Sequence, residues 1–346
     1  MPPIRVGEPW QGQHHTELLL RPYDGSQSDL DALTRVRNAT LRATSRPEEF
    51  RDVSPEELGR YYDGGGFQLE GNAWLMLLGT EPVAAAILYP MAAFDDSPPG
   101  NFHLYVVPQL WRHGIGSRLL DHLEQAAVGR GYPVLETTVA REDDKSTRFL
   151  LNHGFSAVGH TIHLARFSLD NLPNVDLADG FAIRSLAELQ ESPELYRQTA
   201  NRLGAYDLNY SLITPDTLEQ QVAVGRWDPA GALLLFDPTG RIVGVIRTSR
   251  LDERTGYLNE IGLEPASRGK GLGAAMLATA LRYLASIGVE RAELDTPSEN
   301  AAAHNLALRA GFEETRHWLH YLKRLEVGDR ASGIGDQEPK ISKEAK

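Results

Sequence analysis

The sequence has no cysteine, no long apolar run and no excess of basic residues. Its 346 residues include 35 Lys and Arg against 47 Asp and Glu, which gives a formal net charge of −12. Without cysteine, disulfide frameworks, cysteine-ligated zinc sites and thiol nucleophiles are excluded. The acidic balance argues against a nucleic-acid partner, which would need a basic surface, and it mildly favours cationic or neutral partners.

Membrane and export signals are missing as well. The longest mainly apolar stretch, 83–94, contains a proline and falls short of the ~20 residues needed to cross a bilayer. The first fifteen residues lack the apolar segment of a signal peptide. We therefore expect a soluble, cytoplasmic protein with no membrane partner. The length is typical of two domains, at roughly 100–200 residues each.

An internal repeat divides the chain. Gly114 and Gly116 recur 157 residues later as Gly271 and Gly273. The same spacing relates Pro108 to Pro265, Gly131 to Gly288, Glu136 to Glu293, and Gly154-Phe155 to Gly311-Phe312. The repeat is much longer than the unit of a solenoid, so it indicates a duplicated domain.

Both copies show the same pattern of elements. An opening strand precedes a helical region, a hairpin, a strand ending at a proline, a Gly-rich turn, and then helix, strand, helix, Gly-Phe and a last strand. This order predicts an α/β fold in each copy, with a mixed, mostly antiparallel twisted sheet and flanking helices. The predicted units are an N-terminal domain (1–168), a linker (169–180), a C-terminal domain (181–325) and a polar, disordered tail (326–346).

The Gly-rich turns at 111–116 and 268–273 are the first sequence features that indicate a ligand-binding site. Glycines between a strand and a helix expose backbone N–H groups, and with the helix dipole these bind anions such as pyrophosphate. A P-loop is excluded because Lys270 is followed by glycine rather than Ser or Thr. Residues 269–274 satisfy a dinucleotide pattern, but the first copy lacks it and neither turn opens a βαβ unit. A third interpretation is a Gly-rich turn that binds no ligand, and it is disfavoured because the turn recurs in both copies.

The order strand, [QR]-x-x-G-x-[GA], helix, strand, Asn, helix, Gly-Phe resembles the GCN5-related N-acetyltransferases (GNAT). Arg268, Gly271 and Gly273 fit that motif in full, whereas the first copy has Trp111 at the Arg or Gln position. Two copies in one chain are similar to the tandem bacterial acetyltransferases of the mycothiol synthase type. The resemblance covers both halves of the chain.

This resemblance implies an acetyl-CoA site without a metal. Backbone N–H groups would hold the pyrophosphate at Arg268, Gly269, Lys270, Gly271, Leu272 and Gly273, and in the first copy at Arg112, His113, Gly114, Ile115, Gly116 and Ser117. Strand ends would pair with the pantetheine at Ile261, Gly262 and Leu263, and at Val106 and Val107. Asn300 matches the family's asparagine at the pantetheine arm, where the first copy has Asp143.

Amine acetylation needs a base for the ammonium proton and donors for the thioester oxygen. In the family the base is often a carboxylate on the strand before the turn, where Glu260 stands; an ordinary strand carboxylate is the alternative. The first copy has His103 there, which is either a base, with an ordinary pKa of ~6.5, or a structural histidine. Many relatives supply a proton from a tyrosine, but Ala307 and Leu150 occupy that position.

Two histidine pairs also recur, His160-x-x-His163 and His317-x-x-His320. Residues three apart on a strand point to opposite faces, so we do not expect a metal site there.

The sequence thus predicts direct transfer of an acetyl group from acetyl-CoA to an amine, either a small molecule or a peptide. The second half is expected to be catalytic, in a monomer or homodimer. With no cysteine, an acyl-cysteine intermediate is impossible. The alternative hypothesis is a non-catalytic acyl-CoA sensor or interaction protein. A third hypothesis is a nicotinamide or nucleotide enzyme.

Overall fold

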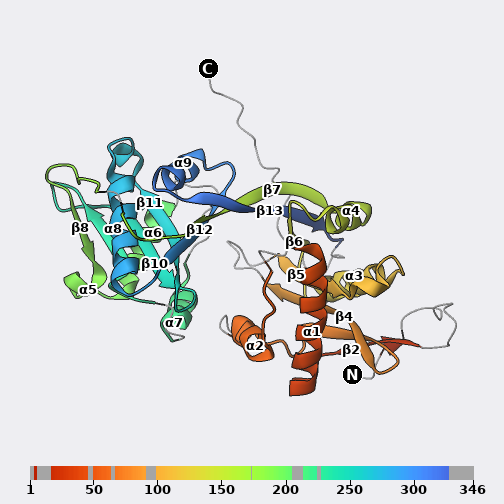
Figure 1. Cartoon of the computed structure of the whole chain (residues 1–346). Coiled ribbons are helices and arrows are strands. Elements are labelled where there is room, and N and C mark those ends of the chain that lie inside the picture. Colours follow the sequence, from red (N-terminus) through yellow and green to blue (C-terminus); the bar gives the residue numbers. More distant parts are fainter. Residues whose placement is uncertain are drawn as a thin grey trace.

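A computed structural model describes residues 4–5, 17–45, 50–63, 67–90, 99–172, 174–204, 213–223 and 227–326. The predicted tail lies outside these residues apart from its first position. Within these residues, thirteen strands form one sheet in the order β1-β2-β3-β4-β5-β6-β13-β7-β12-β11-β10-β9-β8. The sheet carries helices at both ends and gives the molecule two lobes (Figure 1).

The first half contains β1 (Ile4–Arg5), β2 (Leu18–Pro22), α1 (Gln27–Thr44), α2 (Pro55–Asp63), β3 (Ala73–Leu78), β4 (Glu81–Pro90), β5 (Gly100–Val106), η1 (Pro108–Leu110), α3 (Ile115–Gly129), β6 (Val134–Ala140), α4 (Asp144–Asn152) and β7 (Ser156–Arg166). The second half contains β8 (Ala182–Ser185), α5 (Leu186–Leu189), α6 (Pro193–Gly204), α7 (Pro215–Ala223), β9 (Ala232–Phe236), β10 (Ile242–Arg250), β11 (Thr255–Leu263), η2 (Pro265–Ser267), α8 (Leu272–Ser286), β12 (Arg291–Pro297), α9 (Ala301–Arg309) and β13 (Glu313–Arg324).

The structure reproduces the duplication. The elements α3, β6, α4 and β7 begin 157 residues before α8, β12, α9 and β13. Parallel pairing is recorded for β5 with β6 and for β11 with β12, while the other recorded pairs are antiparallel. The predicted mixed, mostly antiparallel sheet is confirmed.

Each half buries both faces of its sheet. Along β4, Ala84, Ala86 and Leu88 pack with α3, whereas Ala85 and Ile87 pack with α1. Burial on both faces explains why this strand is a continuous apolar run rather than an alternating one. The second half repeats the arrangement, with α8 on one face and α6 on the other.

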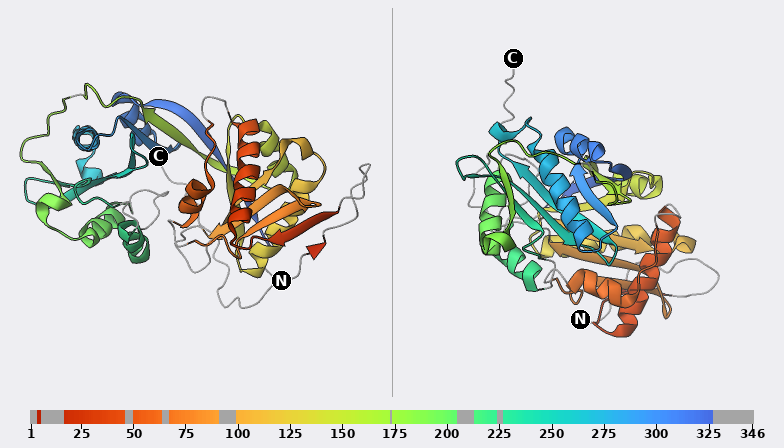
Figure 2. Two further views of the ribbon diagram at one scale, coloured as in Figure 1. Left: turned by 60° about the horizontal axis from the view of Figure 1, so that its bottom comes forward. Right: turned by 60° about the vertical axis from the view of Figure 1, so that its left-hand side comes forward.

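The last strand of each repeat completes the other lobe. The strand β7 pairs with β12 of the second half, and β13 pairs with β6 of the first. The two exchanged strands also pair with each other and run between the lobes (Figures 1 and 2). Leu164 of β7 is buried in the second-half core, and Tyr321 of β13 is buried in the first-half core. The exchange therefore joins both cores to one sheet.

Among the described residues, no helix combines the length and apolar character that a bilayer crossing requires.

Candidate active site

Two parallel strands diverge at the centre of the second half. The strands β11 and β12 pair at Thr255–Tyr257 with Arg291–Glu293 and no further. Beyond this point the ladder between β10 and β11 shifts register, because Arg247 pairs with Glu260 while Thr248 pairs with Leu258. Asn259 is therefore an extra residue in β11, and such a bulge bends a strand and re-aims the side chains next to it. Because the pairing of the two strands ends at Tyr257 and Glu293, their ends leave a V-shaped opening between β11 and β12.

The Gly-rich turn lies at the wide end of this opening. Gly269 and Gly271 adopt φ angles of 75° and 77°, a left-handed conformation that glycine adopts without strain. A Cβ at either position would meet no atom within 4 Å, so the turn is open to a ligand. Gly271 caps α8 without a side-chain hydrogen bond, and the first N–H groups of the helix point out of the turn. This geometry suits a phosphate group.

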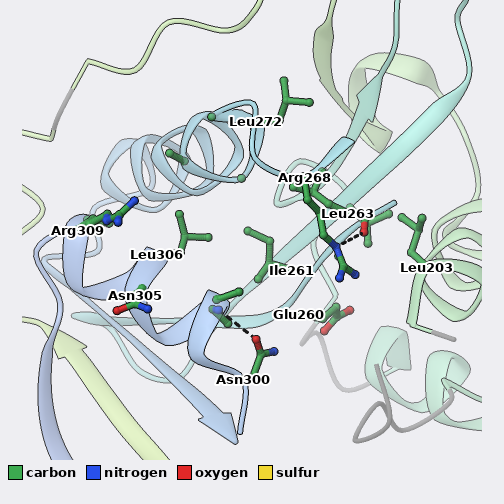
Figure 3. Close-up of a pocket in the computed structure, with 18 of the residues that line it drawn as sticks. Leu203, Glu260, Ile261, Leu263, Arg268, Leu272, Asn300, Asn305, Leu306 and Arg309 are labelled. Atoms are coloured by element: carbon green, nitrogen blue, oxygen red, sulfur yellow. Dashed lines mark hydrogen bonds between the residues drawn. The ribbon is translucent and has the colours of Figure 1, made fainter. Parts of the chain in front are cut away.

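A cavity of about 870 Å³ joins the turn to the opening. Its lining comes from the end of β11, the turn, and the facing sides of α8 and α9, and its size falls in the usual range for ligand pockets. Most of the lining is apolar, and its polar side chains are Glu260, Arg268, Glu299, Asn300, Asn305 and Arg309. Figure 3 shows Glu260 and Arg268 on the β11 side and Asn300, Leu306 and Arg309 on the α9 side.

Most of the predicted residues of the second half line this cavity: Ile261, Gly262, Leu263, Arg268, Gly269, Gly271, Leu272, Gly273 and Asn300. Lys270 is exposed at the turn and is not part of the lining. The Nε of Arg268 donates to the carbonyl of Leu263 (3.1 Å), which fixes the guanidinium beside the strand end. Asn300 begins α9 and accepts from the N–H of Ala303 (3.1 Å).

Several residues that line the cavity were not predicted from the sequence. On α9, Ala302, Leu306, Arg309 and Ala310 line the cavity, and their i, i+4, i+7, i+8 spacing marks one helix face that could have been found. Glu299 precedes the same helix. Leu203 of α6 also lines the cavity, but no pattern in the sequence indicates its position there.

Glu260 lies where the cavity meets the bulge. Its carboxylate accepts two hydrogen bonds from Arg247, at 2.7 and 3.1 Å, and the side chains of Arg247 and Glu260 are 6% and 16% exposed. The guanidinium also stacks over Trp227, 5.2 Å from the ring centroid. This buried partner of Glu260 was not predicted. The arrangement holds a negative charge in a mostly apolar wall.

His103, the counterpart of Glu260, lies in an aromatic cluster. The hydroxyls of Tyr62 and Tyr89 contact its Nδ1 and Nε2 at 2.8 and 3.1 Å. Burial and the nearby Arg37 guanidinium lower the pKa of His103 to about 4. Its neutral ring accepts one of these hydrogen bonds and donates the other, so His103 is a weak proton acceptor.

The predicted first-half turn keeps the backbone but not the surroundings. Gly114 has a φ of 77°, as Gly271 does, and Trp111 donates to the carbonyl of Val106 (2.7 Å) as Arg268 does to that of Leu263. Arg112, His113 and Gly114 are exposed, Val107, Gly116 and Ser117 are half-buried, and Val106 and Ile115 are buried in the core. Asp143 begins α4 and accepts from the N–H of Ser146 (3.1 Å).

The repeated histidine pairs separate between the two faces of the sheet. His160 and His317 stack on one face, with ring centroids 5.7 Å apart. On the other, Nδ1 of His163 contacts Asp295 (2.8 Å) and Nε2 of His320 contacts Thr161 (2.8 Å).

Comparison with known proteins identifies the family of the chain. The acetyltransferase (GNAT) family model matches twice, at residues 36–155 and 203–312. A mycothiol acetyltransferase from Actinosynnema mirum is 30% identical over 219 residues, covering 63% of this chain and 73% of that protein.

Solved structures show the same fold. A GCN5-related N-acetyltransferase from Sphaerobacter thermophilus aligns with a TM-score of 0.71 and 22% identity, over 89% of this chain and 95% of that one. A tandem GNAT protein from the clavulanic acid biosynthesis pathway aligns with a TM-score of 0.65 and 18% identity, over 91% and 100%. With the family matched in both halves and the strand, glycine turn and helix of its motif in place, the chain belongs to the acetyltransferase (GNAT) family and is an acetyltransferase.

Proposed function

We propose that the chain transfers an acetyl group directly from acetyl-CoA to an amine, a small molecule or a peptide, and that the second half carries the reaction. The observation that carries this proposal is the opening between β11 and β12, with an anion-binding turn at one end and a carboxylate at the other. A cavity of about 870 Å³ connects the two. The equivalent position in the first half is His103, whose ring contacts the hydroxyls of two tyrosines.

The residues present fit acetyl-CoA. The open glycines and the start of α8 would bind the pyrophosphate, and Arg268 adds a positive charge beside them. The unpaired edge of β11 at Ile261–Leu263 would hydrogen-bond the amides of the pantetheine arm, while the apolar lining covers its carbon chain. When bound, acetyl-CoA supplies the activated acetyl group.

Glu260 is the proposed proton acceptor. An amine attacks only when neutral, so a group at the site must remove a proton from the incoming ammonium, directly or through a water. Glu260 lies on the cavity wall, and Arg247 fixes its orientation. No tyrosine stands at the family's proton-donor position, because Ala307 is there and is buried in the core. The proton for the leaving thiolate would come from solvent or from the protonated Glu260.

The experiment measures thiol release from acetyl-CoA with a panel of amines. Because a curated relative is named mycothiol acetyltransferase, the amine that such an enzyme acetylates belongs in the panel. Glu260→Gln should lower kcat/KM about 10²-fold or more, the usual contribution of a positioned base. The affinity for CoA should stay within about twofold. The matched control is Glu253→Gln, at an exposed position that does not line the cavity.

Two results would count against the proposal. An unchanged kcat/KM in the folded Glu260→Gln protein would remove Glu260 from the reaction. Thermal stabilisation by CoA without turnover of any amine would favour the alternative, a non-catalytic acyl-CoA sensor. Both oxygens of Glu260 already accept from Arg247, and this is the observation that keeps the alternative open.

A further inference from the structure

We infer that the chain takes one acetyl-CoA, in the second half, because the first half fills its equivalent groove with side chains of α3, α4 and the turn. This inference rests on the proposed function and goes beyond it, since duplication by itself predicts two sites. It assigns the first half a closed groove rather than a weaker copy of the same site.

The groove residues differ systematically between the halves. In the second half the space between α8 and α9 is lined by small or flexible side chains, namely Ala274, Ala302, Leu306 and Ala310. The residues 157 positions earlier are Ser117, Lys145, Phe149 and His153. Each of these side chains is larger or more polar than its counterpart.

These first-half side chains contact one another across the groove. Nδ1 of His153 donates to the carbonyl of Phe149 (2.7 Å), so its Nε2 accepts from the hydroxyl of Ser117 (2.9 Å). The rings of Phe149 and His153 have centroids 4.3 Å apart. A Cβ on Gly116 would lie 3.2 Å from the Phe149 ring, so this ring packs directly on the first turn of α3. Leu306 approaches Gly273 in a similar way, at 3.4 Å, but Ala274 and Ala310 have no polar side-chain atoms to form the hydrogen bond by which Ser117 and His153 tie α3 to α4.

The mouth of the groove is bridged as well. Nζ of Lys145 lies 4.5 Å from the centroid of the Trp111 ring, a cation–π contact. The corresponding second-half residues are Ala302 and Arg268, which both line the cavity. Lys145 and Trp111 therefore join the start of α4 to the Gly-rich turn.

Side chains also occupy the strand carbonyls of the first-half opening. Trp111 donates to the carbonyl of Val106 as Arg268 does to that of Leu263, but the Val106 carbonyl also accepts from Thr40 (3.0 Å). The carbonyl of Phe102 accepts from Thr137 (2.9 Å). The position matching Thr137 is Leu294, which has no hydroxyl to donate. These acceptors are satisfied internally and are poorly available to the amides of a pantetheine arm.

The register of the first half agrees. Pairing between β4 and β5 runs without a shift from Ala84–Val106 to Pro90–Gly100. The bulge that aims Glu260 in the second half has no counterpart in this ladder. The β4–β5 ladder of the first half therefore has no bulge that would re-aim the side chain of His103.

The test on the wild-type chain combines calorimetric titration with CoA and hydrogen–deuterium exchange. We expect one CoA per chain, with amide protection at 268–275 and 300–306 and no change at 111–118 and 143–149. Two CoA per chain would overturn this inference and leave the proposed function standing, and so would a single CoA that protects the first-half segments. No binding at all would overturn the proposed function and this inference with it.

A transplant variant tests the physical cause. Ala302→Lys with Leu306→Phe places first-half side chains in the open groove and should weaken CoA binding about tenfold or more, because the larger side chains occupy space that the bound CoA would fill. The matched control, Lys145→Ala with Phe149→Leu, should leave the Kd within about twofold. Undiminished binding in a folded transplant variant would overturn the assignment; if that variant does not fold, the exchange data on the wild type decide.

Discussion

Glu260 and Arg247 form an ion pair in the wall of a largely apolar cavity. Both side chains are mostly removed from water, which costs several kcal/mol per charge unless the pair and its hydrogen bonds offset it. The two-bond contact and the stacking of Arg247 on Trp227 supply that offset. The same contacts leave the carboxylate a single orientation at the cavity.

Replacing only Arg247 should therefore lower the free energy of unfolding much more than replacing Arg247 and Glu260 together. We expect Arg247→Met to lower the free energy of unfolding by on the order of 3 kcal/mol, because it leaves a buried carboxylate unpaired. The double variant Arg247→Met with Glu260→Gln should recover most of that loss. Urea unfolding of the four proteins measures the coupling. The exposed pair Arg254–Glu290 is the control, where Arg254→Met should cost less than about 1 kcal/mol.

The contrary result would be an additive double variant, which would show that the two side chains do not stabilise each other. The pair itself could not be predicted from sequence. Residues 247 and 260 face each other because of the register of β10 against β11, and the equivalent partners in the first half are Ile87 and His103. By contrast, the glycines of the turn were predicted, since their left-handed backbone depends on local geometry.

At the scale of elements, the exchanged strands depend on specific contacts. His163 of β7 bonds to Asp295 of β12 and lies 3.5 Å from the carboxylate of Glu293. Burial by itself would lower the pKa of His163, but the hydrogen bonds to Asp295 and Glu293 outweigh it and raise the pKa to about 9. Tyr257 donates to the same Asp295, and burial raises its pKa above the ordinary value, so this hydroxyl stays neutral near pH 9.

The raised pKa predicts a stability that depends on pH. The unfolded pKa of histidine is ~6.5, so the protonated contact stabilises fully below about pH 6.5 and is lost as the pH rises through about 9. Because Asp295 is 39% exposed, we discount the contribution to about 1–2 kcal/mol. His163→Gln should lose this amount at pH 6 and little at pH 10, measured by urea unfolding. An equal loss at both pH values would contradict the assignment.

The existence of these strands was predictable, but their partners were not. Both last strands follow Gly-Phe at the same spacing, so either could pair within its own repeat or with the other. Pairing is decided by which sheet edge lies within reach after folding. The structure places β7 beside β12 and β13 beside β6.

At the scale of the whole molecule, the exchange makes the two halves one cooperative body. A six-pair ladder joins β7 to β12, and a seven-pair ladder joins β13 to β6. The connection between the halves therefore depends on the hydrogen bonds of these two ladders and on core contacts, and much less on the covalent linker.

We expect a chain cut in its linker to stay assembled. A protease recognition sequence can be inserted between Ala178 and Asp179, which are both exposed. Cleavage there would break the covalent connection between the two repeats. After cleavage the two fragments should co-elute in size-exclusion chromatography and keep acetyl transfer, and they should separate in denaturant as the control. Fragments that part under native conditions would show that the crossed ladders do not hold the lobes together.

The sequence by itself determined the duplication, the mixed sheet, the glycine turns and the family, because these depend on local backbone geometry and on a spacing visible in one chain. Only the tertiary structure decided the strand exchange, the Arg247 partner of Glu260 and the contacts that fill the first-half groove. Each of these brings together residues from different strands or helices. Such contacts are fixed by how the elements pack, which the spacing of residues along the chain does not encode.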